Sequence, residues 1–292
     1  MINTKRDCTT SVKGTGTGGC RTKKKYIVRR HLIQKGYKFD KLNDSLDDSR
    51  IKELIQKGVL VVLPQTVGFE PQHKEPNYEE IQKQEIFISG TVYGWRLNYE
   101  ADACLSSGLA SLSSKSWDIL EVDEDGELNL CETSDGFLKG FDGNLARYEG
   151  MVDNDGSKAA KLNFKIQLTK TGSIEYDSSY IALPKGDINW LGLSGIDEVQ
   201  IEKTSSGIFV AFSCDQTSPV EGLVSANFRV LDTNGVVVPG VTVTEVGEGN
   251  YTLTGLTAGN DYVIYLYDNS VKANVVSVAN YYYKSNKLTY SA

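Results

Sequence analysis

Residues 121–132 carry the pattern closest to a ligand set for a metal ion. Acidic residues stand at positions 1, 3, 5 and 12 of this segment and glycine at position 6, the spacing of a calcium-binding loop. However, position 1 is a glutamate, whose length crowds the tight first turn, and the flanking residues alternate with period two. We therefore interpret the segment as a β-hairpin turning at Asp125-Gly126 and keep a weak calcium site as the alternative. Its ligands would be Glu121, Asp123, Asp125 and Glu132.

A second pattern, Gly14-x-Gly16-x-x-Gly19, has the form of a dinucleotide-binding fingerprint. The fingerprint works because a strand delivers the chain to the phosphates and a helix N-terminus receives them. Polar residues precede these glycines, lysines follow them, and no helix signal is present. Cys20 also stands where a P-loop needs lysine. We therefore predict no nucleotide site and no cofactor.

Acid–base and nucleophilic chemistry has few candidate residues in this chain. Its only histidines, His31 and His73, lie in segments that we expect to be exposed or extended. The acidic residues gather at turns, and no nucleophile–base pair can be identified. We predict that the protein is not an enzyme and has no catalytic residues.

Five cysteines occur at irregular spacing, with no CxxC pair and no zinc-ligand spacing. We expect reduced structural thiols in a protein made in a cytoplasm, with a Cys8–Cys20 disulfide as the alternative. The N-terminus is charged from Lys5 onward and lacks an apolar signal segment. No apolar run approaches the roughly 18 residues that span a bilayer, so we expect no membrane association.

Charge is distributed unequally along the chain. Residues 1–40 hold 11 lysines and arginines against two aspartates, a net charge of +9, so the remaining 252 residues carry −16 of a total of −7. This glycine-rich segment cannot bury enough apolar surface to order alone, and we expect an extended arm that orders against a partner. We favour an acidic surface on a neighbouring copy; nucleic acid, which the acidic body repels, and plain solvation are the alternatives. The arm residues expected to reach a neighbouring subunit are Arg21, Lys23, Lys24, Lys25, Arg29 and Arg30.

We place the end of the arm at residue 48 and divide the rest of the chain into three regions, 49–85, 86–216 and 217–292. The first region, residues 49–85, is expected to contain a short helix, a strand and a linker. The helix is predicted by Ile51, Leu54 and Ile55 at spacings of three and four, and Gly58 ends it. The strand is Val59–Leu63, and residues 65–85 read as a polar linker without a period.

Residues 86–216 predict an antiparallel β-domain, because apolar and polar residues alternate between turns. A short helix is expected within 101–114. Trp95, Trp117 and Trp190 are expected as core anchors, with a sugar-stacking platform as the alternative. Aspartate–glycine pairs predict hairpin turns at Asp125-Gly126, Asp135-Gly136, Asp142-Gly143 and Asp155-Gly156.

Residues 217–292 predict a separate β-sandwich of about seven short strands. The succession Asp232-x-Asn-Gly235, Val238-Pro-Gly-Val-Thr-Val243 and Gly249-Asn-Tyr-Thr-Leu-Thr-Gly-Leu256 resembles immunoglobulin-like and transthyretin-like modules. Such modules serve as spacers, decorations or binding surfaces. The fold class is therefore mainly β: an extended basic arm, a turn-rich antiparallel domain with one or two short helices, and this terminal module.

The whole arrangement, with its acidic hairpin-rich stretch Trp117–Gln167 and the module from Pro219, resembles virion structural proteins of tailed bacteriophages. The resemblance is to tail-ring or tube-type subunits of crAss-like phages. It implies a homo-oligomeric cyclic ring in the virion, bound to other tail proteins and made in the host cytoplasm. The alternative is a binding or decoration module that contacts glycans or cell surfaces through the immunoglobulin-like domain.

Overall fold

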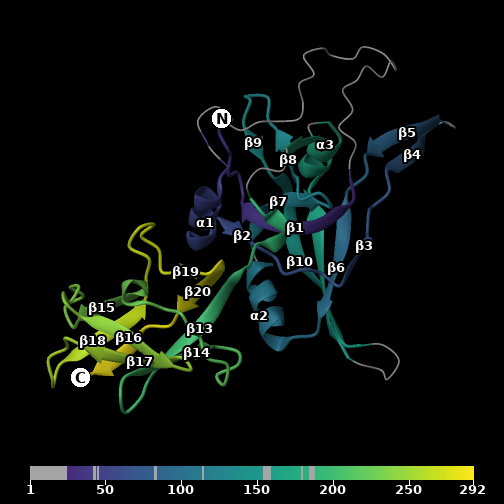
Figure 1. Cartoon of the computed structure of the whole chain (residues 1–292). Helices are drawn as coiled ribbons and strands as arrows, with labels where there is room; N and C mark the ends of the chain where they lie inside the picture. The colour runs from purple at the N-terminus through teal and green to yellow at the C-terminus, as the bar shows by residue number, and fades with distance from the viewer. Residues whose placement is uncertain are drawn as a thin grey trace. The chain divides into compact units, whose positions relative to one another are not determined.

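The computed structural model describes residues 25–41, 44, 46–81, 84–113, 115–153, 159–178, 180–183 and 188–292 (Figure 1). Strands make up 47% and helices 14%, which confirms the mainly β class. The chain forms two compact units. The first contains the residues up to Arg50 together with Val62–Gly192, and the second contains Ile51–Val61 together with Leu193–Ala292.

The first unit is built on one large sheet whose strand pairs are antiparallel. Its main strand order is β12-β8-β7-β10-β11-β6-β3. Outside this order, β1 also pairs with β7, and β9 pairs with β8. The strands are β1 (Ile27–Gln34), β3 (Gly68–Pro71), β6 (Gly94–Glu100), β7 (Ser116–Asp123), β8 (Leu128–Glu132), β9 (Leu138–Lys139), β10 (Phe141–Val152), β11 (Lys161–Leu168) and β12 (Tyr180–Leu183).

Strands β1 and β7 form the centre of this unit. Every residue of β7 after Ser116 is buried, and so are Arg30, His31, Leu32 and Ile33 of β1. Residues 27–34 therefore belong to the folded core, which corrects the expectation of an extended arm over this part of the chain. Strand β3 likewise places part of the expected linker in the sheet.

The aspartate–glycine pairs have different outcomes. Gly126 (φ 77°) lies in the turn between β7 and β8, and Gly136 (φ 82°) lies in the turn between β8 and β9, so both predicted turns are confirmed. Gly143 lies inside β10 instead, where a Cβ would stand 2.8 Å from Cγ1 of Ile119. That glycine is required by close packing, and the predicted turn is wrong. The fourth pair, at 155–156, lies outside the described residues.

Three α-helices occur in the described part of the chain. The predicted helix α1 (Asp48–Gln56) ends in a Schellman motif, because the Gly58 and Val59 amides donate to the carbonyls of Ile55 and Leu54. Helix α2 (Ala103–Leu112) falls within the predicted 101–114, and Asp102 caps it. Helix α3 (Lys170–Ser178) was not predicted; Thr169 begins it by accepting from the Gly172 amide.

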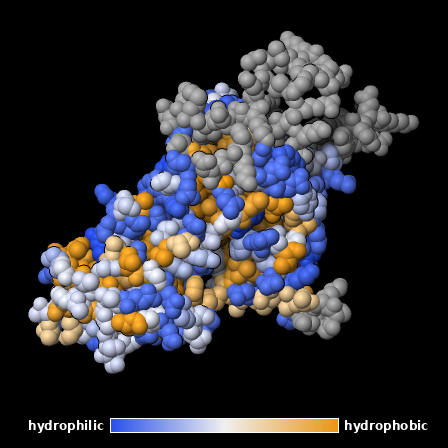
Figure 2. Space-filling view, viewed as in Figure 1, coloured by the Kyte–Doolittle hydropathy of each residue, from blue (hydrophilic) through white to orange (hydrophobic). Residues whose placement is uncertain are grey.

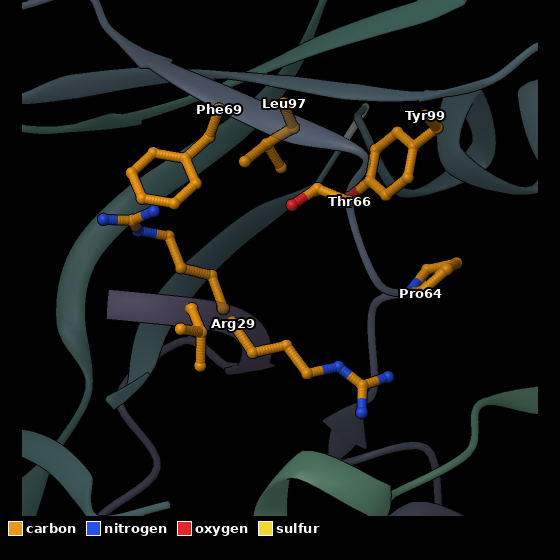
Figure 3. Close-up of a pocket in the computed structure, with 8 residues that line it drawn as sticks. Arg29, Pro64, Thr66, Phe69, Leu97 and Tyr99 are labelled. Carbon is orange, nitrogen blue, oxygen red and sulfur yellow. The ribbon is translucent and has the colours of Figure 1, made fainter. Parts of the chain in front are cut away.

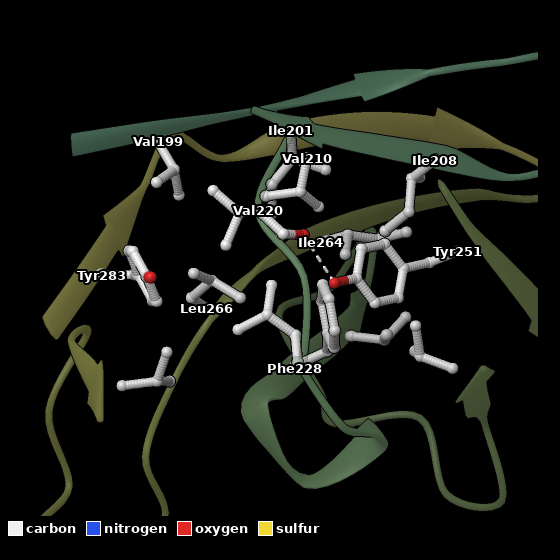
Figure 4. Packing of buried hydrophobic residues seen from close by; sticks show 14 of the residues in the cluster. Val199, Ile201, Ile208, Val210, Val220, Phe228, Tyr251, Ile264, Leu266 and Tyr283 are labelled. Atoms are coloured by element: carbon white, nitrogen blue, oxygen red, sulfur yellow. Dashed lines mark hydrogen bonds between the residues drawn. The ribbon is translucent and has the colours of Figure 1, made fainter. Parts of the chain in front are cut away.

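The second unit consists of two sheets around one hydrophobic core (Figure 4). The phenol of Tyr251 donates to the Val220 carbonyl (2.7 Å) inside this core. The six-stranded sheet has the order β16 (Thr242–Gly247), β17 (Asn250–Thr254), β14 (Ile208–Phe212), β13 (Ile196–Lys203), β20 (Tyr281–Ser285) and β19 (Val276–Val278). The three-stranded sheet has the order β15 (Phe228–Asp232), β18 (Asp261–Leu266) and β21 (Leu288–Ser291).

The boundary between the units lies earlier than predicted. Val199 and Ile201 of β13 and Val210 of β14 share their core with Ile264 of β18, so residues from Leu193 onward belong to the second unit. A second unit that starts at residue 217, as predicted, would leave out β13 and β14, although both strands contribute to its core. The part of helix α1 from Ile51 onward also belongs to this unit, where the Gln56 amide donates to the Val275 carbonyl (3.1 Å).

Candidate functional site

The candidate site is the root of the basic N-terminal segment, where the chain enters β1. The Lys25 ammonium pairs with the carboxylates of Asp125 and Glu127 in the β7–β8 turn, the latter at 3.1 Å. The hydrogen bond to Asp125 raises the pKa of Lys25. The Glu124 amide donates to the Tyr26 carbonyl (2.9 Å). The last residues before β1 are thus fixed to this turn by main-chain and side-chain contacts.

Arg30 anchors the next part of this root inside the first unit. Its guanidinium pairs with Glu121, directly opposite on β7, with 2.8 Å between Nη2 and Oε1. The same group lies over the ring of Trp95 (4.1 Å to the centroid) and over that of Phe69 (5.2 Å). Both charged side chains are almost completely buried. The pair is therefore a structural contact whose partners depend on each other.

Arg29 points to the other face of β1. Its guanidinium donates to the main-chain carbonyls of Leu191 (2.6 Å) and Leu63 (2.9 Å). Burial lowers the pKa of Arg29. This side chain therefore ties β1 to the main chain of two other segments of its own unit, at Leu191 and Leu63.

These contacts correct the expected role of part of the basic arm. Arg30 is 6% exposed and cannot reach a neighbouring subunit. Lys25 and Arg29 are bound within their own chain. Arg21, Lys23 and Lys24 lie outside the described residues, so the expectation of an inter-subunit role stays a prediction for these three.

The four carboxylates of the calcium-loop pattern have separate roles. Glu121 pairs with Arg30, Asp125 pairs with Lys25, and Glu132 pairs with Lys41 (2.6 Å). Asp123 accepts from the amides of residues 125 (3.0 Å) and 127 (2.9 Å) and so shapes the turn. The hairpin interpretation is confirmed, and no group of three or more metal-ligating side chains occurs in the described residues.

The two histidines differ in environment. His31 is fully buried beside the Trp190 backbone, although neither ring nitrogen makes a hydrogen bond of normal geometry. Burial, with the nearby Arg29 charge, lowers its pKa to about 3, so the imidazole is neutral. The expectation that His31 is exposed is wrong. His73 is exposed, and its Nδ1 accepts from the Gly94 amide (3.2 Å).

A small cavity lies beside the root, between β1 and β6 (Figure 3). Its volume is about 10 Å³, room for about one water. Burial raises the pKa of Tyr99, whose hydroxyl has no hydrogen-bond partner among the described residues. The cavity is too small for an organic ligand. It is lined by Val28, Arg29, Arg30, Pro64, Thr66, Phe69, Leu97 and Tyr99.

The three tryptophans are core residues. Trp95, Trp117 and Trp190 are each 5% exposed or less, which confirms the prediction of core anchors over a sugar-stacking surface. Trp117 also donates from its indole nitrogen to the Leu112 carbonyl (2.9 Å). The sequence did not reveal that Trp95 covers the guanidinium of Arg30. These residues lie on β6 and β1, and no sequence spacing indicates that the two strands come together.

The cysteines depart from the expected reduced state. Cys104 and Cys214 are disulfide-bonded, whereas Cys131 is buried and belongs to no disulfide. Cys8 and Cys20 lie outside the described residues. The expectation of reduced thiols therefore holds for Cys131 alone among the three described.

No protein-family model matches the chain, and no curated protein matches it at a significant level. Among the described helices, none is long and apolar enough to cross a membrane. The functional argument therefore rests on the geometry of the root and on the charge of the segment that continues from it.

Proposed function

We propose that the protein is a structural subunit of a phage virion, a tail-ring component in which basic segments lock neighbouring copies into a cyclic ring. The observation that carries the proposal is the fixed root of a strongly basic segment. Residues 1–24 have a net charge of +5, whereas the rest of the chain has −12. The basic residues are Lys5, Arg6, Lys13, Arg21, Lys23 and Lys24, against the single acid Asp7.

The physical argument concerns charge and geometry. Opposite charge steers association between copies and sets their register more than it adds affinity. A root fixed by Lys25 and Tyr26 gives every copy the same starting point for its segment. A repeated head-to-tail contact of this kind closes into a ring when the rotation between copies allows it.

The second unit supports the immunoglobulin-like part of the proposal. Two sheets enclose its core, and the parallel pair β13–β20 joins two strands that lie far apart in the sequence of the unit. We propose that this unit is an immunoglobulin-like module that projects from the ring or braces the next layer. In the virion the partners are further copies of this chain and other tail proteins.

The direct test removes residues 1–24 and keeps Lys25 and β1. Deletion of residues 1–40 is unsuitable because it removes a core strand. Native mass by light scattering after gel filtration, with negative-stain images, should show a salt-sensitive ring for the full chain. The truncated chain should be a folded monomer. Unchanged assembly of the truncated chain rejects the proposed role of the segment.

A binding or decoration module is the second candidate, and one observation favours it. Tyr281 is 53% exposed on the second unit, as an aromatic contact for a sugar ring would be. Binding on a glycan array that Tyr281→Ala abolishes would favour this candidate. Trp190, which is buried, cannot serve as such a contact.

A further inference from the structure

The outer face of the three-stranded sheet in the second unit carries two tyrosines and two cations. Arg229 of β15 stands directly opposite Tyr265 of β18, and each lies between two residues of the hydrophobic core. Side chains alternate along a strand, so Arg229 and Tyr265 point away from that core. Tyr267 follows just after β18, and Lys287 stands just before β21. We call these four residues the Arg229 surface.

Each cation of this surface is held over a tyrosine ring. The guanidinium carbon of Arg229 lies 4.2 Å from the ring centroid of Tyr267, and the ammonium of Lys287 lies 5.2 Å from that of Tyr265. The two rings meet edge to face, with their centroids 6.1 Å apart. Cation–π contacts of this kind fix the position of a charge without neutralising it.

Neither cation has an anionic partner among the described residues. No ion pair or hydrogen bond of the Arg229 guanidinium or of the Lys287 ammonium occurs there, and Nε of Arg229 is buried without an acceptor. The aspartates at the ends of the same strands are engaged elsewhere. Asp232 and Asp268 accept from amides of their own turns, and Asp261 accepts from a serine hydroxyl on β21. The sheet therefore presents two positive charges that nothing described compensates.

The exposure of the rings limits the class of ligand. Tyr265 is 8% exposed, and a cation covers a face of each ring. A sugar ring or a nucleic-acid base needs an open aromatic face, so both fit this surface poorly. Residues 193–292 also hold five lysines and arginines against ten aspartates and glutamates, and this net charge of −5 repels nucleic acid. What remains is a positioned guanidinium beside an ammonium, which is the chemistry that binds carboxylates.

We propose that the Arg229 surface binds a carboxylate-rich segment of a protein partner. Arg229, flat over the ring of Tyr267, pairs with one carboxylate, and Lys287 pairs with a second. Because the ring already orders the long arginine side chain, less conformational entropy is lost on binding. Tyrosine and arginine are also the side chains that dominate the binding energy at protein interfaces. The inference goes beyond the proposed ring and does not depend on residues 1–24.

Zero-length cross-linking of the full chain tests the site. The probe is an acetylated deca-glutamate peptide, whose carboxylates a carbodiimide joins to the lysine amines that they contact. The matched control is Lys272, which is exposed on the same unit and also has no ion pair among the described residues. At low salt, peptide mass spectrometry should show about tenfold more probe on Lys287, the ratio that one charge-assisted hydrogen bond gives. Equal coupling of the two lysines, or none, overturns the proposal.

Variants test whether Arg229 and the ring beneath it make the site. Arg229→Gln and Tyr267→Leu should each lower the coupling of Lys287 towards the level of Lys272, because the positioned guanidinium is lost. Tyr267→Phe keeps the ring and should keep the coupling. Circular dichroism confirms that each variant is folded. Unchanged coupling in Arg229→Gln, or the same coupling in Tyr267→Leu as in Tyr267→Phe, overturns the site.

Competition distinguishes a protein partner from other acidic ligands. The coupling of Lys287 is measured with added deca-glutamate that lacks the acetyl label, with oligogalacturonate and with oligothymidylate, each at the same concentration of negative charge. Deca-glutamate should displace the probe most effectively, because the covered rings offer no stacking to a sugar or a base. Stronger displacement by either other competitor assigns the surface to acidic sugars or to single-stranded nucleic acid and overturns the protein partner.

Discussion

At the scale of residues, the Arg30–Glu121 pair determines how the root of the basic segment is held. The guanidinium lies between a carboxylate at 2.8 Å and the ring of Trp95 at 4.1 Å, with almost no exposure to water. Removing one member of such a pair leaves an uncompensated charge in the interior, which costs more than the pair itself contributes. The two charges of the root therefore depend on each other, because losing either one leaves the other unpaired in the interior.

Glu121→Gln tests this dependence. The neutral amide leaves the Arg30 charge uncompensated, and we expect the free energy of unfolding to fall by about 3–5 kcal/mol. Glu132→Gln is the matched control, because its ion pair with Lys41 is partly exposed and should contribute about 1 kcal/mol or less. Urea denaturation of both variants measures the difference. Equal small losses would show that Arg30 does not depend on Glu121.

The buried His31 predicts a pH dependence of stability. Its pKa is about 3 in the folded protein against 6.5 when unfolded, so below pH 6.5 the unfolded chain binds the extra proton. The contribution is complete above pH 6.5 and falls as pH decreases towards 3, by up to ~1.4 kcal/mol per pH unit. His31→Gln removes this titration. Urea unfolding of both proteins between pH 7 and pH 4 should show a steeper decline for the wild type, and parallel curves would contradict this account.

The cysteine states give a chemical prediction. When the unreduced protein is unfolded and treated with iodoacetamide, Cys131 should be alkylated while Cys104 and Cys214 should not. Reduction before alkylation should label all three. Peptide mass spectrometry measures each site separately. Labelling of Cys104 and Cys214 without reduction would restore the expectation of free thiols.

At the scale of elements, close packing at Gly143 distinguishes a strand from the predicted turn. A Cβ there would lie 2.8 Å from Cγ1 of Ile119 and 3.1 Å from the Gln167 carbonyl oxygen. We expect Gly143→Ala to destabilise the protein by about 1–3 kcal/mol. Gly108→Ala in α2 is the control, because its Cβ meets nothing within 4 Å and should stabilise the helix by about 0.5–1 kcal/mol. Thermal unfolding that shows the same sign for both variants would contradict this packing.

Local signals in the sequence were sufficient for some elements and insufficient for others. Apolar spacing and Gly58 predicted α1, and the pair Asp125-Gly126 predicted its hairpin, because both depend on neighbouring residues. Strand β1 was assigned to an arm because it was counted with a basic, glycine-rich segment that cannot bury enough apolar surface to order alone. Their partners, Glu121 and Trp95, are distant in sequence, and no local pattern shows that a charge will be paired and buried.

The same reason explains the misplaced boundary and the outcome for the candidate site. Strands β13 and β14 alternate in the same way as those before them, and only the shared core with Ile264 shows which unit they complete. The basic segment was recognised from composition alone. Its folded root at Lys25–Arg30 required knowledge of the pairing with β7.

At the scale of the whole molecule, the central claim is that the basic segment links copies of the chain. We propose that a fixed root, a segment of +5 and a remainder of −12 together give an electrostatic link between copies, and such a link is sensitive to salt. At 1 M salt the Debye length falls to about 3 Å, and exposed charges on separate copies no longer attract each other. The intramolecular fold, held mainly by buried contacts, should persist under the same conditions.

The most direct measurement is light scattering after gel filtration of the full chain and of the chain lacking residues 1–24, each at low and high salt. The account predicts a ring-sized particle for the full chain at low salt that dissociates at high salt, and a folded monomer for the truncated chain at both. A truncated chain that forms the same particle, or a full chain that is monomeric at every salt concentration, would contradict it.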